Sequence, residues 1–149
     1  MKNIKIIVAA HKKYQMPQEK IYMPVQVGAE GKNSINGYVQ DNVGNNISIK
    51  NPYFCELTGL YWAWKNLDAD YIGLVHYRRY FTVAKKIPKN ENEKFKKILT
   101  SEEAEKKLEK ADVILPKLRN YYIENLYSHY AHTMYVEPLE ETRKIIEEK

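Results

Sequence analysis

Three short apolar runs constrain the fold of this chain more than any other feature. They cover residues 5–10, 71–75 and 112–116, and apolar residues mostly follow one another in them instead of alternating with polar ones. Such runs are typical of strands buried on both faces of a parallel sheet. Helical patterns lie between them, so the sequence predicts an α/β fold with a mostly parallel sheet.

The strongest helical pattern begins at Asn51 and extends to about residue 66. Asn51 suits the N-cap, and Pro52 suits the first helical position. Cys55 is expected to be a small buried apolar residue and not a nucleophile. The apolar residues at helical spacing should face the core, and these are Phe54, Leu57, Leu60, Tyr61 and Trp64.

Three further helices are expected in the second half of the chain. Thr100 and Glu103 form a capping-box pattern, which predicts a helix to about residue 111. Residues 122–132 and 138–148 are also predicted to be helical.

The remaining segments have the composition of loops and turns. Residues 11–50 are rich in Gly and Asn, which predicts a long, ordered, partly packed loop. Residues 84–97 are rich in Lys and are expected to be a mobile surface excursion. The run Asp68-Ala69-Asp70 matches a metal-binding pattern of many sugar transferases, but it precedes a strand where such a site follows one. We therefore predict a helix-to-strand turn there.

Length and composition exclude several classes of protein. The 149 residues suit one domain, 1–149, and the single cysteine rules out a disulfide framework. No apolar run approaches the ~20 residues of a membrane span, and the first residues lack a signal-peptide core, so the cytosol is the expected compartment. The 13 Tyr and 2 Trp suit surfaces that bind sugars or bases, and they suit a half-buried sheet equally well. The net charge of +5 favours a phosphate-bearing ligand or an anionic surface, whereas no basic helix stripe supports nucleic-acid binding.

Polar and cationic residues follow each expected strand. His11 and Lys12 come after the first strand, residues 76–79 (His-Tyr-Arg-Arg) after the second, and Lys117 after the third. Ligands bind beyond the carboxyl ends of parallel strands, where these side chains should meet. Guanidinium groups match phosphate oxygens in a bidentate way, which predicts a diphosphate site. The alternative is a strand end held by structural ion pairs and stacked rings.

Two other groups of side chains are weaker candidates. Asp41 and Asn42 lie in a segment of short polar residues that could bind ribose or sugar hydroxyls, or bond to its own backbone. His129 and His132 share a helix face near Glu124, but two histidines without a third placed ligand are weak evidence for a metal. No phosphate-binding glycine fingerprint is present.

Four blocks of the sequence resemble the domain-of-unknown-function family 4422. They are residues 6–12, 37–42 with 46–48, 51–65 and 71–81, and the most specific parts are Trp62-Ala63-Trp64-Lys65 and His76-Tyr77-Arg78-Arg79-Tyr80-Phe81. The resemblance implies a bacterial glycosyltransferase of capsular, exopolysaccharide or O-antigen synthesis. It also implies a Rossmann-like GT-A-type fold that binds a nucleotide-diphospho-sugar, with a UDP-linked donor and a saccharide or lipid-linked saccharide acceptor.

By position, residues 76–79 occupy the strand end where relatives of that fold carry Asp-X-Asp. Cations there would neutralise the leaving diphosphate directly, so no cofactor is expected, and a divalent metal such as Mn²⁺ or Mg²⁺ is the alternative. No catalytic base can be assigned. The expected diphosphate-binding residues are Arg78, Arg79 and Lys12, and the expected nucleotide- or sugar-binding residues are His11, Asp41, Asn42, His76 and Tyr77.

Members of that family are longer than this chain, which leaves other functions open. The chain is expected to lack the C-terminal half of the fold, and a catalytically inactive nucleotide- or glycan-binding module is the first alternative. A basic domain that binds nucleic acid ranks well below it. The expected location is the cytoplasm, with peripheral contact at the inner face of the plasma membrane.

Overall fold

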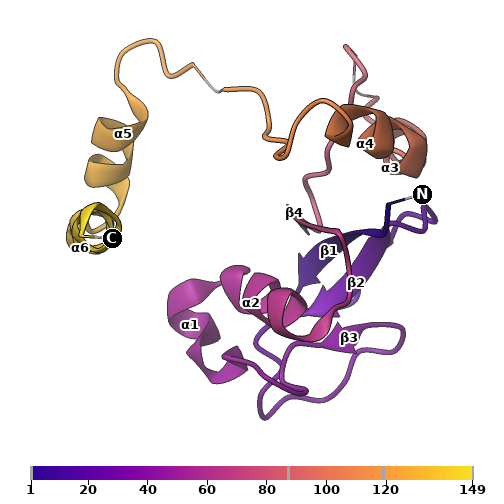
Figure 1. The fold of residues 1–149 in the computed structure, drawn as a ribbon, viewed down its shortest axis with the longest axis horizontal. Coiled ribbons are helices and arrows are strands. Elements are labelled where there is room, and N and C mark those ends of the chain that lie inside the picture. The colour runs from indigo at the N-terminus through magenta and orange to yellow at the C-terminus, as the bar shows by residue number, and fades with distance from the viewer. Residues whose placement is uncertain (1, 87, 119, 149) are drawn as a thin grey trace. The chain divides into compact units, whose positions relative to one another are not determined.

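The computed structural model describes residues 2–86, 88–118 and 120–148, and the chain divides into two compact units, Met1–Ile114 and Leu115–Lys149. In the described residues of the first unit, parallel strands form one sheet in the order β3-β2-β1-β4 (Figure 1). The strands are β1 (Ile4–Ala10), β2 (Tyr22–Gln26), β3 (Val39–Gln40) and β4 (Tyr71–His76). The predicted α/β fold with a mostly parallel sheet is confirmed.

The central strand β1 explains why its sequence is apolar on every side. It pairs with β2 on one edge and with β4 on the other, and Ile6 lies opposite both Tyr22 and Gly73. Alternate side chains of β1 enter two separate hydrophobic clusters, with Ile6 in one and Ile7 in the other. A strand covered on both faces needs a continuous apolar run, which is the pattern in the sequence.

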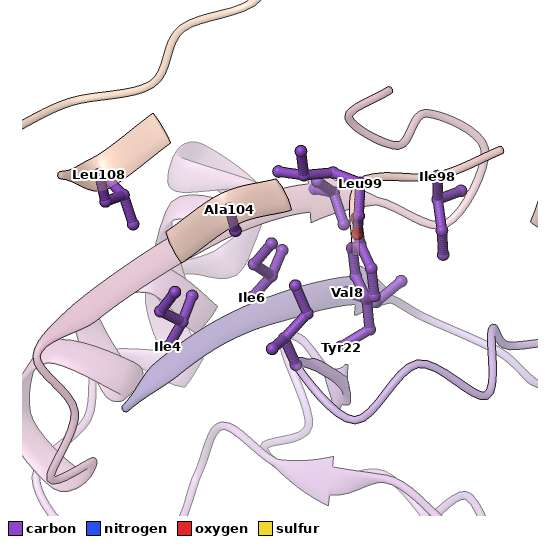
Figure 2. Close-up of a cluster of buried hydrophobic side chains, with 10 residues drawn as sticks. Ile4, Ile6, Val8, Tyr22, Ile98, Leu99, Ala104 and Leu108 are labelled. Carbon is purple, nitrogen blue, oxygen red and sulfur yellow. The ribbon is translucent and has the colours of Figure 1, made fainter. Parts of the chain in front are cut away.

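One face of the sheet is covered by α4 (Ser101–Leu108) and by the segment that leads into it. The predicted capping box is present, since Thr100 accepts a hydrogen bond from the Glu103 amide and Glu103 accepts one from the Thr100 amide. The helix ends at Leu108, earlier than expected. Figure 2 shows the cluster beneath it, to which β1, β2, α4 and the segment before α4 contribute: Ile4, Ile6, Val8, Tyr22, Ile98, Leu99, Ala104 and Leu108.

The opposite face is covered by α2 (Leu57–Asn66), which does not bury the side that its sequence predicts. The buried residues of α2 are Thr58, Gly59, Trp62 and Ala63. Leu60 packs against the cluster as predicted, but Trp64 is 63% exposed and Leu57 is 52% exposed, so the expected inward face was wrong for these two residues. Gly59 allows the close approach, because a Cβ there would lie 2.7 Å from Cγ1 of Val27.

The helix predicted from Asn51 to residue 66 is interrupted at Cys55. That residue has a φ of 47° and is exposed, so the prediction of a buried cysteine was also wrong. A short helix α1 (Asn51–Phe54) precedes the break and follows the 3₁₀ turn η1 (Ser48–Lys50). Asn51 lies inside α1 and not at its N-cap. Its side-chain amide donates to the Cys55 carbonyl, and this hydrogen bond stabilises the turn between α1 and α2.

Two segments have a different secondary structure from the one predicted. Residues 11–50 contain strands β2 and β3 in addition to ordered loops, so this segment is more regular than expected. Residues 112–116 form no strand, and that prediction was wrong. These residues lie where the first unit ends. Ile114 is partly buried against the hydrophobic cluster beneath α4.

The excursion predicted for residues 84–97 begins and ends at one place on the first unit. The Leu99 amide donates to the Phe81 carbonyl at 2.8 Å, and the Thr82 hydroxyl donates to the Lys97 carbonyl. The segment contains α3 (Glu91–Phe95), and Ile87 lies outside the described residues. Its mobility stays a prediction.

The second unit contains the two helices expected near the C-terminal end of the sequence. They are α5 (Leu126–Thr133), whose N-cap Asn125 accepts from the Ser128 amide, and α6 (Glu137–Glu147). Among the described residues, no helix is long and apolar enough to span a membrane.

Candidate functional site

The carboxyl ends of β1 and β4 lie side by side, as the sequence predicts. Ala9 is in register with His76, and the Tyr77 amide donates to the Ala9 carbonyl at 3.3 Å. The residues that follow each strand therefore meet at one edge of the sheet. His11 contacts Tyr77 edge-on, with ring centroids 5.7 Å apart.

A tight turn follows β4 and sets the direction of the two arginines. The Arg79 amide donates to the His76 carbonyl at 2.8 Å, which closes the turn. Arg78 and Arg79 consequently line one pocket of about 360 Å³ together with His76. The other lining residues are Glu56, Leu74 and Val75.

Both guanidinium groups are available to a ligand. Arg78 and Arg79 are exposed, and among the described residues neither forms an ion pair with a carboxylate. The Arg78 guanidinium lies 5.2 Å from the centroid of the Tyr77 ring, which limits the directions it takes. Two such forks at one pocket offer the planar donor pairs that phosphate oxygens accept.

Aromatic rings also contact the residues of this turn. Tyr77 stacks on Tyr14 with centroids 3.6 Å apart and planes 12° apart, and Lys12 lies 5.6 Å from the Tyr14 ring. The Tyr38 hydroxyl accepts from the Tyr14 amide at 2.9 Å and donates to its carbonyl at 3.2 Å, so the loop after β1 is fixed. Burial, followed by the hydrogen bond and charge of Tyr77, raises the pKa of Tyr14 to about 12. The Tyr14 hydroxyl therefore stays protonated at neutral pH.

His76 and Glu56 form a pair inside the pocket. The Nε2 atom of His76 lies 3.6 Å from Oε1 of Glu56, and the Arg78 amide donates to Nδ1 of His76 at 3.4 Å. Burial lowers the pKa of His76 from its ordinary value, and Arg78 and Arg79 lower it further, while Glu56 opposes them. The imidazole is therefore neutral at pH 7.

Sequence reasoning identified the arginines and His76 but missed Glu56 and Tyr14. Glu56 is the N-cap residue of α2, on a helix that precedes β4, and nothing in its local sequence distinguishes it from a solvated helix-start carboxylate. Only the packing of α2 beside the end of β4 brings it to the pocket. Tyr14 carries one signal, because it lies in the short basic segment that follows a buried strand.

Asp41 was predicted to bind sugar or ribose, and the structure corrects this. Its side chain is fully buried, so no ligand can reach it. Its two carboxylate oxygens accept four hydrogen bonds, from the amides of Gly28 and Ala29 and from the hydroxyls of Ser48 and Thr58. Asp41 is a structural residue that ties β3 to α2 and to the loop after β2.

Three other sequence predictions concern Asn42, the Asp68–Asp70 segment and Lys117. Asn42 is not among the residues that line it, and its carbonyl accepts from the Asn46 side chain. The Asn3 amide donates to Asp70 at 2.7 Å, so the Asp68–Asp70 segment is the predicted turn between α2 and β4. Lys117 follows no strand, because residues 112–116 form none.

The histidines of α5 are engaged by a single carboxylate. Nδ1 of His129 and Nδ1 of His132 lie 2.7 Å and 3.0 Å from the two oxygens of Glu124. The hydrogen bond from His129 is the main cause that lowers the pKa of Glu124. Within the described ranges, no group of three or more His, Cys, Asp or Glu side chains is arranged to hold a metal ion.

Comparisons with known proteins agree with this fold. The family model described as a domain of unknown function, DUF4422, matches residues 5–149. The structure is similar to the apo structure of WbbM, a bifunctional glycosyltransferase, with a TM-score of 0.79 and 31% sequence identity. The similarity covers 98% of this chain and 29% of the WbbM chain, so this chain spans less than a third of that protein's length. No curated protein matches the sequence.

Proposed function

Since the chain belongs to the DUF4422 family and shares its fold with part of a glycosyltransferase, we propose that it binds a nucleotide-diphospho-sugar for transfer of the sugar to a saccharide. One observation carries the proposal: two guanidinium groups without carboxylate partners in the described structure line a pocket at the carboxyl end of β4. That edge of a parallel sheet is where ligands bind in α/β folds.

The two arginines suit the departure of a nucleoside diphosphate. As the bond between the sugar and the diphosphate breaks, negative charge develops on the leaving phosphate oxygen. Guanidinium donors placed at that oxygen would stabilise the developing charge. Arg78 and Arg79 would bind the diphosphate, with Lys12 nearby, while Tyr77, His11 and His76 would contact the nucleotide or sugar. In this proposal the guanidinium groups act in place of a divalent metal.

Direct binding measurements test the diphosphate site. The protein is titrated with UDP by calorimetry, with GDP as the nucleotide control, and each titration is repeated with Mn²⁺. We expect metal-independent UDP binding that is weakened at least tenfold in Arg78→Ala and in Arg79→Ala. Lys106→Ala in α4 removes one exposed positive charge far along the chain from the pocket and should leave the affinity unchanged. UDP binding that requires Mn²⁺, or that survives both arginine substitutions, would contradict the proposal.

Transfer itself is tested separately from binding. Labelled UDP-sugars are incubated with the protein and saccharide primers, and incorporation of label is measured. UDP binding with no incorporation would support an inactive nucleotide- or glycan-binding module instead of a transferase. Failure to bind UDP, together with salt-dependent binding of single-stranded RNA, would favour a nucleic-acid-binding protein.

The proposal extends to the acceptor and the location. We propose a saccharide or lipid-linked saccharide acceptor of bacterial capsular, exopolysaccharide or O-antigen synthesis, and a cytoplasmic protein with peripheral contact at the inner membrane face. The net charge of +5 is compatible with an anionic lipid surface. Co-sedimentation with vesicles that contain anionic lipid, compared with neutral vesicles, tests the membrane contact.

A further inference from the structure

The pocket at the end of β4 contains a carboxylate beside its two arginines, although opposite charges at such a site ordinarily pair. Glu56 lines the pocket with Arg78 and Arg79, and its side chain is 42% exposed. Among the described residues, the Glu56 carboxylate lies beside the neutral His76 ring and forms no ion pair with either arginine. The pocket therefore offers two kinds of group to a ligand. Arg78 and Arg79 can donate hydrogen bonds to an anion, and Glu56 can accept a hydrogen bond from a hydroxyl group.

His76 lies beside the Glu56 carboxylate but leaves its oxygens free to accept other hydrogen bonds. Because the Arg78 amide donates to Nδ1 of His76, the proton of the neutral ring belongs on Nε2, which faces Glu56. The separation of 3.6 Å is longer than a good hydrogen bond, so the carboxylate keeps most of its acceptor capacity. The ring is itself held by Tyr77, whose centroid lies 4.0 Å away.

The Glu56 carbonyl accepts from the Gly59 and Leu60 amides, but its side chain makes no hydrogen bond among the described residues that would explain its position. Glu56 is the N-cap residue of α2, yet its side chain makes no capping hydrogen bond. A carboxylate ion accepts hydrogen bonds and cannot donate them, so its ligand partner must be a donor such as a hydroxyl group. The arginines require the opposite chemistry, an acceptor such as a phosphate oxygen.

We infer that Glu56 binds a hydroxyl group of the sugar that the diphosphate carries, and so distinguishes a nucleotide-sugar from the free nucleotide. The inference rests on the proposed function and assigns the sugar side of the same site. A pocket of about 360 Å³ is near the lower end of the ~300–1,000 Å³ of ligand pockets, which suits a diphosphate with one sugar. The rest of the nucleotide would extend towards the Tyr14 and Tyr77 rings.

The test compares the affinity for UDP with the affinity for UDP-sugars, in the unaltered protein and in one variant. The protein and Glu56→Gln are titrated with UDP and with UDP-glucose, UDP-galactose, UDP-N-acetylglucosamine and UDP-N-acetylgalactosamine. Glu56→Gln removes a negative charge near the diphosphate, so UDP should bind equally well or more tightly. The sugar loses a charged acceptor, so the best-bound UDP-sugar should bind at least tenfold more weakly. A structural role for Glu56 would move both affinities in the same direction.

Two further variants sharpen the comparison. Glu109→Gln changes an exposed carboxylate outside the pocket and should alter neither affinity. His76→Gln keeps a neutral donor but loses the ring geometry, and it should weaken the UDP-sugar by a smaller factor than Glu56→Gln. A parallel change of UDP and UDP-sugar affinity in Glu56→Gln would overturn the inference and leave the proposed function intact. Unaltered protein that binds no UDP-sugar more tightly than UDP would overturn it too, whereas a failure to bind UDP at all would overturn the proposed function.

Discussion

The hydroxyl of Thr58 donates a hydrogen bond of 2.6 Å to Asp41, and both side chains are fully buried. The contact joins the loop after β3 to the first turn of α2, which covers one face of the sheet. We expect Asp41→Ala to lower the free energy of unfolding by about 3 kcal/mol or more, because buried donors lose a charged acceptor. Urea denaturation followed by circular dichroism measures the change, and an unaltered midpoint would contradict it.

Gly59 should be intolerant of a methyl group, although alanine is the better helix former. An exposed glycine in a helix gains about 1 kcal/mol when it becomes alanine. At Gly59 the added Cβ would lie 2.7 Å from Val27 and 3.4 Å from Ile7, so we expect Gly59→Ala to destabilise the fold by about 1–3 kcal/mol. Thermal melting checks the sign, and a raised melting temperature would show that α2 does not pack this closely.

The capping box of α4 offers a measurable coupling. Thr100→Ala should cost about 1 kcal/mol of unfolding free energy, because the Glu103 amide loses its acceptor. Glu103→Ala removes the reciprocal bond to the Thr100 amide. Since the two bonds belong to one motif, the double variant should lose less than the sum of the single losses. Denaturation curves of the three variants give the losses of unfolding free energy. A loss in the double variant equal to the sum of the two single losses would count against the capping box.

His76 should titrate below the ordinary histidine value of 6.5, because burial, Arg78, Arg79 and His11 all lower its pKa and Glu56 alone raises it. Glu56→Gln should therefore lower the pKa further, and Arg79→Ala should raise it. Imidazole NMR signals followed against pH give these values. Shifts of the opposite sign in both variants would exclude the arrangement of these groups in the pocket.

The same titration has a consequence for stability. Below pH 6.5 the unfolded chain binds a proton at this histidine before the folded chain does, so the contribution of His76 to stability falls as the pH falls. His76→Gln should reduce this part of the pH dependence. The comparison of denaturation midpoints at neutral and mildly acidic pH tests it, with an unchanged difference as the contrary result.

The strands that sequence could predict are those with a simple pattern. β1 and β4 are continuous apolar runs, whereas β2 contains Pro24 among mixed residues and β3 has only two residues. The face of α2 was mispredicted because large apolar residues such as Trp64 lie outside, and small ones such as Gly59 lie inside. A hydrophobic pattern marks size and polarity, but it does not mark the need for close approach between a helix and a sheet.

The residues of the candidate site also differ in how far the sequence could predict them. Arg78 and Arg79 could be identified because they directly follow a buried strand, and strand ends meet at one edge. Asp41 and Glu56 could not be told apart as functional or structural, since the local sequence of neither carboxylate shows which groups pack around it. Only the packing shows that Asp41 is enclosed by four donors, while Glu56 faces an open pocket.

The order of the sheet also determines when the site comes into existence during folding. Ile6 pairs with Tyr22, a near neighbour along the chain, and with the far more distant Gly73. Closing the longer loop costs more chain entropy, so the β1–β2 half can form from local contacts before β4 joins. His11 and Tyr77 can meet only when that more distant strand is in place. A partly folded chain would therefore have half a sheet and no site, and ligand binding would report completion of the fold.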